Sequence, residues 1–216
     1  MNRRIITGPK RLKLSIYWIG LLLVFYSGIA QCSPQSPQGT KQYSGSDEEQ
    51  IQKLLVEKTI EQTRKRGKYK KIFLSPYTQI SEDDVKYGLA QAKSLKQETI
   101  DDFWSKNKEP SKLTIEDANQ VYSLKEFSEL DQIIGERNNS ESHNSLSRKL
   151  NGGEVIICLS RVGFDKDRKQ AFAYVFSIRA WVNLYETRTT YVLSRINGIW
   201  TVESEPSALH VIVDFF

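Results

Sequence analysis

The chain has 216 residues, 39% of them hydrophobic and 11% aromatic, which is enough for one packed domain and excludes a wholly disordered protein. Its two cysteines and two histidines exclude a disulfide-dense scaffold or a zinc ribbon. The formal net charge of +5 comes from the N-terminus, because five of the 31 basic residues and none of the 26 acidic ones lie in residues 1–30. Residues 31–216 are therefore formally neutral, and we expect no nucleic-acid partner.

Residues 1–30 have the organisation of a secretory signal. A basic stretch precedes an uncharged run over residues 14–30, and small residues near its end fit a cut between Ala30 and Gln31. As a helix this run is about 25 Å long, just short of the hydrocarbon core, so it could also stay uncleaved as a membrane anchor.

Cys32 offers a third possibility, lipidation, because Ile29–Cys32 resembles the cleavage box of bacterial lipoproteins. Gln31 departs from that pattern, which requires a small residue before the cysteine. In each case we predict an exported protein, either secreted, periplasmic or held at the cell envelope, and export would permit a Cys32–Cys158 disulfide. Cys158 lies in an apolar strand pattern and is equally consistent with a small buried hydrophobic residue.

Residues 31–46 are rich in Pro, Gln, Gly and Ser and predict a flexible tether, followed by a single domain over residues 47–216. The first predicted helix covers residues 47–66, because Ser46 and Glu49 form a capping box and Gly67 can end it.

Further elements follow in chain order. A short strand at residues 72–74 precedes a helix that begins after Ser81, and Thr99 caps a third helix that ends before Pro110. The patterns next predict a strand at 121–124, a helix that ends at Gly135 and a mobile polar excursion over 136–153. The remaining residues predict strands at 155–162, 170–182, 187–195, 200–203 and 209–214.

Asn197-Gly198 is a strong signal for a tight hairpin between two of these strands, since both residues tolerate the positive φ of a type I′ turn. Helices followed by antiparallel strands indicate the α+β class, with several N-terminal helices packed on a C-terminal antiparallel β-meander.

Several segments resemble a group of uncharacterised exported bacterial proteins. Residues 159–165 (LSRVGFD), 170–175 (QAFAYV), 191–193 (YVL) and 197–200 (NGIW) match that group's meander, and residues 98–107 (ETIDDFWSKN) match a segment of its first half. The resemblance implies export and kinship but no activity, because the group has no assigned reaction. Many members carry a Cys-Gly-Pro-Leu-Cys-like loop where this chain has residues 180–186 without cysteine, so no redox or disulfide role carries over.

Arg161 lies within the best-matching segment and is expected on a strand among apolar neighbours. We interpret it as a buried guanidinium that pairs with Asp101 or Asp102 and docks the third helix onto the meander. The alternative is a guanidinium that lines a pocket for a carboxylate or phosphate.

The segment 64–71 contains six basic residues, Arg64, Lys65, Arg66, Lys68, Lys70 and Lys71. They could bind an anionic surface, or they could complement the negative end of the helix dipole. No motif predicts a catalytic residue, a metal site or a cofactor. We therefore expect a non-catalytic module outside the cytoplasm that binds a protein or small ligand, with a hydrolase of scattered residues or a small-ligand pocket protein as the alternative.

Overall fold

The computed structural model describes residues 45–67, 69–113, 115, 121–135, 140–180 and 184–213, all within the compact unit Gln42–Phe216. The predicted leader, with Ala30, Gln31 and Cys32, lies outside the described residues, as does almost all of the tether. None of the helices in the described part of the chain is long and apolar enough to span a membrane.

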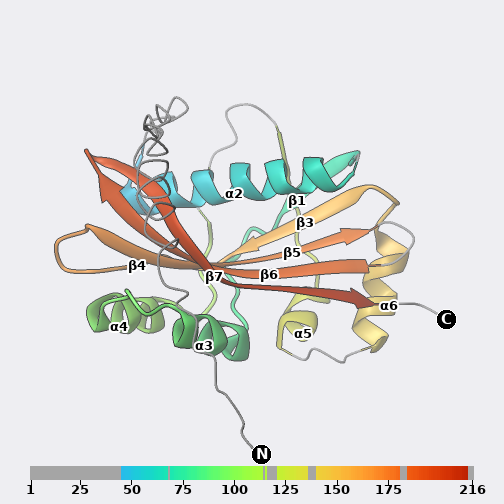
Figure 1. Cartoon of the computed structure of the whole chain (residues 1–216). Coiled ribbons are helices and arrows are strands. Elements are labelled where there is room, and N and C mark those ends of the chain that lie inside the picture. Colours follow the sequence, from blue (N-terminus) through green and yellow to red (C-terminus); the bar gives the residue numbers. More distant parts are fainter. Residues whose placement is uncertain are drawn as a thin grey trace, which may run out of the picture. The chain divides into compact units, whose positions relative to one another are not determined.

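A mixed sheet of seven strands forms the centre of the domain (Figure 1). The strand order is β2-β1-β3-β5-β6-β7, and β4 pairs with β5 beside this path. β1 is parallel to both of its neighbours, whereas the pairs from β3 onward are antiparallel. The strands are β1 (Lys71–Leu74), β2 (Ser123–Leu124), β3 (Glu154–Leu159), β4 (Gly163–Phe164), β5 (Gln170–Ala180), β6 (Leu184–Ile196) and β7 (Ile199–Val213).

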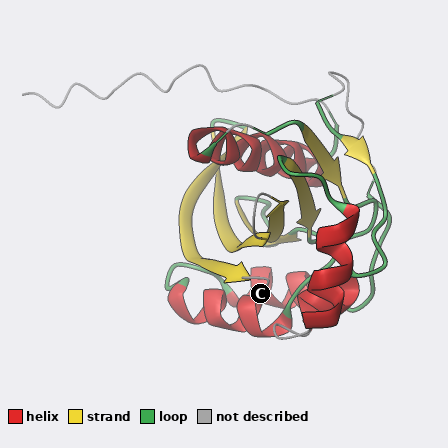
Figure 2. Ribbon diagram, turned by 90° about the vertical axis from the view of Figure 1, so that its right-hand side faces the viewer, coloured by secondary structure: helices red, strands yellow, loops and turns green. Residues whose placement is uncertain are grey.

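Helices cover both faces of the sheet. The long helix α2 lies across one face, and four shorter helices lie across the other (Figures 1 and 2). These helices are α2 (Asp47–Arg66), α3 (Glu82–Gln91), α4 (Gln97–Lys106), α5 (Leu130–Gly135) and α6 (Ser140–Lys149). The predicted α+β class, with helices that precede antiparallel C-terminal strands, is confirmed, and the parallel β2-β1-β3 part is an addition that the sequence patterns did not predict.

Two separate hydrophobic cores follow from this arrangement. Between α2 and the sheet, Ile51 and Leu55 pack against residues such as Ile157. On the opposite face, Phe103 of α4 packs edge-on against Phe172 of β5, with ring centroids 4.9 Å apart. Because both faces are covered, β3 and β5 are buried at nearly every position instead of alternating between buried and exposed residues.

Two local signals act as the sequence predicts. Ser46 and Glu49 form the reciprocal capping box at the start of α2. Asn197 and Gly198 adopt φ of 51° and 80°, so they turn the chain between β6 and β7.

Three expectations are corrected. Residues 136–153 were expected to form a mobile excursion, but they contain the helix α6. Its residues Leu146 and Leu150 are buried, and His143 is hydrogen-bonded to the buried Glu186. Thr99 lies inside α4 and does not cap it, because the helix begins at Gln97. Lys96 occupies the capping position, and its backbone N–H donates to the side chain of Gln170. The two expected C-terminal strands form one strand, β7.

Candidate functional site

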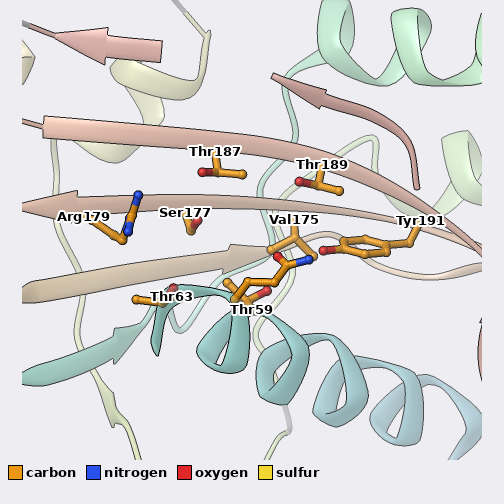
Figure 3. A pocket seen from close by; sticks show the side chains of 9 residues that line it. Thr59, Thr63, Val175, Ser177, Arg179, Thr187, Thr189 and Tyr191 are labelled. Atoms are coloured by element: carbon orange, nitrogen blue, oxygen red, sulfur yellow. The ribbon is translucent and has the colours of Figure 1, made fainter. Parts of the chain in front are cut away.

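A narrow polar cleft lies between α2 and the sheet, and we call it the hydroxyl cleft (Figure 3). Most of its lining side chains carry a hydroxyl group. The lining residues are Thr59, Gln62 and Thr63 of α2, Val175, Ser177 and Arg179 of β5, and Thr187, Thr189 and Tyr191 of β6.

Strand periodicity places the sheet residues in one row. Side chains two positions apart on a strand share a face, so Ser177 and Arg179 point the same way. The antiparallel register pairs Ser177 with Thr187 and Val175 with Thr189, and directly paired residues lie on the same face. The face that is apolar beneath the N-terminal half of α2 therefore becomes polar towards Arg179.

The helix changes character at the same place. Leu55, Thr59 and Thr63 follow one another at intervals of four residues, so they lie on one side of α2. Leu55 belongs to the hydrophobic core, whereas Thr59 and Thr63 face the cleft. The helix wall and the sheet wall of the cleft thus both change from apolar to hydroxyl-bearing residues at the same place. Apolar residues would fill this space without burying polar groups that need hydrogen-bond partners.

The cleft is small. Only about 10 Å³ of it is wide enough for a water molecule. That volume matches about one water, or one polar group of a larger ligand. Thr59, Thr63, Ser177 and Thr189 are buried, whereas Arg179 is half-buried, so the guanidinium marks the more exposed part of the lining.

A second group of polar side chains is sealed inside the opposite core, and we call it the buried ion cluster. It consists of Asp84 on α3, His143 on α6, Tyr174 on β5, and Glu186 and Arg188 on β6. The side chains of the four ionic or imidazole groups are at most 6% exposed, and Tyr174 is fully buried.

The guanidinium of Arg188 is the centre of this cluster. Its Nη1 donates to Asp84 at 2.9 Å, and its Nε and Nη2 donate to Glu186 Oε2 at 3.2 and 2.9 Å. The other oxygen of Glu186 is hydrogen-bonded to Nε2 of His143. Arg188 Nη2 also donates to the carbonyl of Ile133 on α5, at 3.1 Å. Because Tyr174 of β5 also donates to Asp84, at 3.3 Å, the cluster joins α3, α5 and α6 to β5 and β6.

The charges in this cluster remain paired despite their burial. Burial alone lowers the pKa of Arg188, but its hydrogen bond to Asp84 and the nearby charge of Glu186 raise the pKa above its ordinary value. Burial, together with the negative charge of Asp84, raises the pKa of Tyr174 well above its usual range. The guanidinium therefore stays charged and the phenol stays neutral, so we assign the cluster to helix docking.

The structure adds to the sequence interpretation of two residues in this region. The helix predicted to begin after Ser81 has Asp84 in its first turn, where this carboxylate forms a buried ion pair with Arg188, 104 residues away in the sequence. His143 was expected in a mobile loop, whereas it is 1% exposed. The Glu186-x-Arg188 spacing on one strand was the available signal, but only the tertiary structure shows that this face is buried.

The predicted pairing of Arg161 with Asp101 or Asp102 is wrong. Arg161 lies between β3 and β4, is about one-third exposed, and forms a bidentate pair with Glu48 of α2 at 2.6 and 2.9 Å. The hydrogen bonds to Glu48 raise the pKa of Arg161 above its ordinary value, although burial alone would lower it. The charge of Asp102 makes a smaller contribution in the same upward direction.

The two aspartates have other partners. Asp101 accepts from Gln97 at 2.9 Å, and Asp102 accepts from Lys106 at 2.7 Å and from the backbone N–H of Phe164 at 2.8 Å. Asp102 therefore does dock α4 onto the strands, but through a backbone group of β4. Arg161 instead docks α2 through Glu48, and it lines neither of the two pockets described here.

The described side chains of the basic segment 64–71 differ in their surroundings. Arg64 donates to the hydroxyl of Tyr69 at 2.6 Å, and Lys65 forms an i,i+4 ion pair with Glu61. Lys71 places its ammonium 4.8 Å from the ring centroid of Phe73, and Lys70 is exposed. The side chain of Arg66 and all of Lys68 lie outside the described residues.

Cys158 is a free, fully buried thiol on β3. Its burial raises the pKa of the thiol well above the usual range, so it is an inert hydrophobic residue in this environment. Its proposed disulfide partner, Cys32, lies outside the described residues. Within the described part of the chain, no group of His, Cys, Asp and Glu side chains could hold a metal ion.

A wider, open groove of about 330 Å³ lies beside the loops that follow β1 and α4. Three of its polar lining residues have partners within the protein: Glu82 pairs with Lys86, Asp131 accepts from Gln79, and Asn107 accepts from the backbone N–H of Arg161. One buried oxygen of the lining residue Gln79, Oε1, accepts no hydrogen bond in the described structure. We take the hydroxyl cleft as the candidate site because most of its lining side chains carry a hydroxyl group that can donate and accept hydrogen bonds.

No protein-family model, curated protein or solved structure matches this chain. The chemistry of the hydroxyl cleft is consequently the basis on which a function can be argued.

Proposed function

We propose that this chain is a non-catalytic binding module that acts outside the cytoplasm and holds a small polar ligand in the hydroxyl cleft. The basic and apolar leader over residues 1–30 supports export, as does the resemblance of residues 159–175 to exported bacterial proteins. The module would be secreted or periplasmic, or held at the envelope by residues 14–30 or by a lipid on Cys32.

The observation that carries the binding role is the make-up of the cleft lining. Hydroxyl and amide groups donate and accept hydrogen bonds, and a guanidinium donates several in a fixed plane. General acid–base or activated-nucleophile catalysis needs a carboxylate, imidazole, thiol or amine beside the reacting atoms. The described lining residues carry none of these groups. This set of side chains is suited to recognition.

The first experiment determines where the protein works. Cells that make the chain are fractionated, and the intact mass of the mature protein is measured in each fraction. A soluble species that begins at Gln31, or a membrane species that is full length or acylated at Cys32, supports export. A full-length protein found in the cytoplasm would overturn this part of the proposal.

The second experiment tests the cleft as the binding site. Protein purified from its own compartment is denatured, and the small molecules that it releases are identified by mass spectrometry. The double variant Thr187→Val/Thr189→Val removes two cleft hydroxyls at nearly constant volume. The control Thr201→Val removes a hydroxyl that donates to the Ser194 carbonyl away from the cleft.

We expect the wild type and the control to carry the same molecule and the double variant to lose it while keeping its fold. If the double variant carries the same molecule, or if no variant and no wild type carries any, the cleft is not the binding site. Turnover of ester or glycoside substrates that depends on the cleft hydroxyls would instead support a hydrolase.

A further inference from the structure

We infer that the open groove of about 330 Å³ is a second binding site, and that it takes a primary ammonium or guanidinium group on an aliphatic stem. We call it the loop groove, and its walls come from residues 78–82, residues 107–110 and α5. A free alkylamine and the lysine or arginine side chain of a peptide both carry such a group. The loop groove shares no lining residue with the hydroxyl cleft, so this inference goes beyond the proposed function and does not depend on it.

The loop groove has the size and the fixed walls of a small-ligand site. Its volume lies at the lower end of the range for such sites, roughly 300–1,000 Å³. The backbone N–H of Thr78 donates to the carbonyl of Ser111, and the backbone N–H of Ser111 donates to Oγ1 of Thr78, both at 2.8 Å. The backbone N–H of Gln79 donates to the carbonyl of Leu159 on β3, at 2.9 Å. A ligand would therefore meet walls that the protein has already ordered.

The charge of the lining favours a cation. Three carboxylates line the loop groove, those of Glu82, Glu109 and Asp131, against one ammonium, that of Lys108. Glu82 pairs with Lys86, but the two side chains are 69% and 62% exposed, so water screens this pair. Neither Glu109 nor Asp131 forms an ion pair with a described residue. The potential in the loop groove is therefore negative and attracts a cationic group.

Two neighbouring acceptors in the lining are short of donors. Nε2 of Gln79 donates to Oδ1 of Asp131, and no other described group donates to this carboxylate. An ionised carboxylate only accepts hydrogen bonds, so this contact fixes which end of the Gln79 amide faces Asp131. The other end, Oε1 of Gln79, is buried and accepts no hydrogen bond in the described structure. An ammonium has three N–H donors and a guanidinium five, and both bring the positive charge that Asp131 lacks.

Apolar side chains in the same lining suit the stem of such a ligand. Ile80, Pro110 and Ile134 line the loop groove together with the carboxylates. Long basic side chains bury their methylene groups on apolar surface and keep the charged end at polar partners. A bare metal ion would leave these apolar groups without a contact, and no group of described His, Cys, Asp and Glu side chains could hold one.

The test uses the mature ¹⁵N-labelled protein, purified from its own compartment. Backbone amide shifts are followed at pH 7 and constant ionic strength while one of four probes is added. The cationic probes are n-butylammonium chloride and the blocked peptides acetyl-Gly-Lys-Gly-amide and acetyl-Gly-Arg-Gly-amide. The neutral probe is acetyl-Gly-norleucine-Gly-amide, which has the butyl stem of the lysine peptide without its ammonium.

Two variants remove a carboxylate from the lining at nearly constant shape, Asp131→Asn and Glu109→Gln. The matched control is Asp167→Asn, which removes an exposed carboxylate that does not line the loop groove. The control keeps the overall charge equal to that of each variant, so it separates a local contact from the general attraction of a cation to an acidic protein.

We expect at least one cationic probe to shift the amides of Gln79, Glu109 and Asp131 in a saturable way, and the norleucine peptide to shift none of them. Asp131→Asn should weaken this binding by roughly tenfold or more, because a charge-assisted hydrogen bond is lost. Glu109→Gln should weaken it less, and Asp167→Asn should leave it unchanged. Tighter binding of a peptide than of butylammonium identifies a peptide as the source of the group, and equal or weaker binding identifies a free amine.

Three results would overturn the inference: no saturable shift with any cationic probe, equal binding of the norleucine peptide, or equal binding by the wild type and Asp131→Asn. The proposed function fails separately, if the double hydroxyl variant retains the molecule that co-purifies with the wild type.

Discussion

The Nη1 atom of Arg188 lies 2.9 Å from Oδ2 of Asp84, and the two side chains are 0% and 6% exposed. This contact joins β6 to α3 inside the core. Buried charges are costly to transfer from water, so their contribution depends on the completeness of the pairing. Here the second carboxylate, Glu186, and the carbonyl of Ile133 accept from three of the other four guanidinium N–H donors.

Loss of the guanidinium should therefore be severe. We expect Arg188→Leu to lower the free energy of unfolding by about 3–5 kcal/mol, because two buried carboxylates lose their counter-charge. Chemical denaturation measures this loss. The matched control is Arg168→Leu, whose ion pair with Asp47 is partly exposed and should contribute less than about 1 kcal/mol. Similar small losses for both variants would contradict the assignment of the cluster to helix docking.

The pair between Arg161 and Glu48 predicts a specific energetic coupling. In a double-mutant cycle, Arg161→Ala and Glu48→Ala should couple by about 0.5–1 kcal/mol, since their bidentate pair is partly exposed. The cycle of Arg161→Ala with Asp102→Ala should give a smaller value, because Asp102 is bonded elsewhere. Larger coupling to Asp102 than to Glu48 would restore the pairing expected from the sequence.

The close approach of α3 to β6 depends on Gly88. A Cβ atom at this position would lie 2.3 Å from Oγ1 of Thr190, so the strand or helix must shift. Alanine favours helices by about 1 kcal/mol over glycine, but overpacking a core costs about 1–3 kcal/mol. Gly88→Ala should therefore lower the melting temperature, and Gly88→Ala/Thr190→Ala should recover part of it. An increase in the melting temperature of the single variant would refute this account.

Asp165 should make stability depend on pH in the acidic range. Burial raises its pKa, but hydrogen bonds from Lys96 and from the backbone N–H groups of Gln170 and Lys169 outweigh burial and lower the pKa below its ordinary value. A lowered folded-state pKa contributes stability above the unfolded value of about 3.9 and loses it as the pH falls below that value.

Denaturation curves between pH 6 and pH 3 measure this dependence, and the wild type should lose stability more steeply than Asp165→Asn on acidification. Asp167→Asn, at an exposed position two residues away, should follow the wild type. If Asp165→Asn and the wild type show the same slope, the stabilising role of this carboxylate is wrong.

Short-range chemistry is what the sequence by itself determined. The capping box of Ser46 and Glu49 is complete within four residues, so α2 begins where the sequence predicts. The turn at Asn197 and Gly198 depends only on the φ angles that these residues tolerate. The order of helical and strand periodicities was likewise sufficient for the α+β class.

The tertiary structure alone decided which polar residues meet. Ser140–Lys149 lacks a strong apolar stripe, and it is helical because His143 and Leu146 find a buried surface on the sheet side of the domain. Glu48 and Arg161 are 113 residues apart. The hydroxyl cleft combines one side of α2 with one face of β5 and β6. Strand alternation predicts that Ser177 and Arg179 share a face of the sheet. Which helix covers that face depends on strand register and helix packing, and these act across the whole chain.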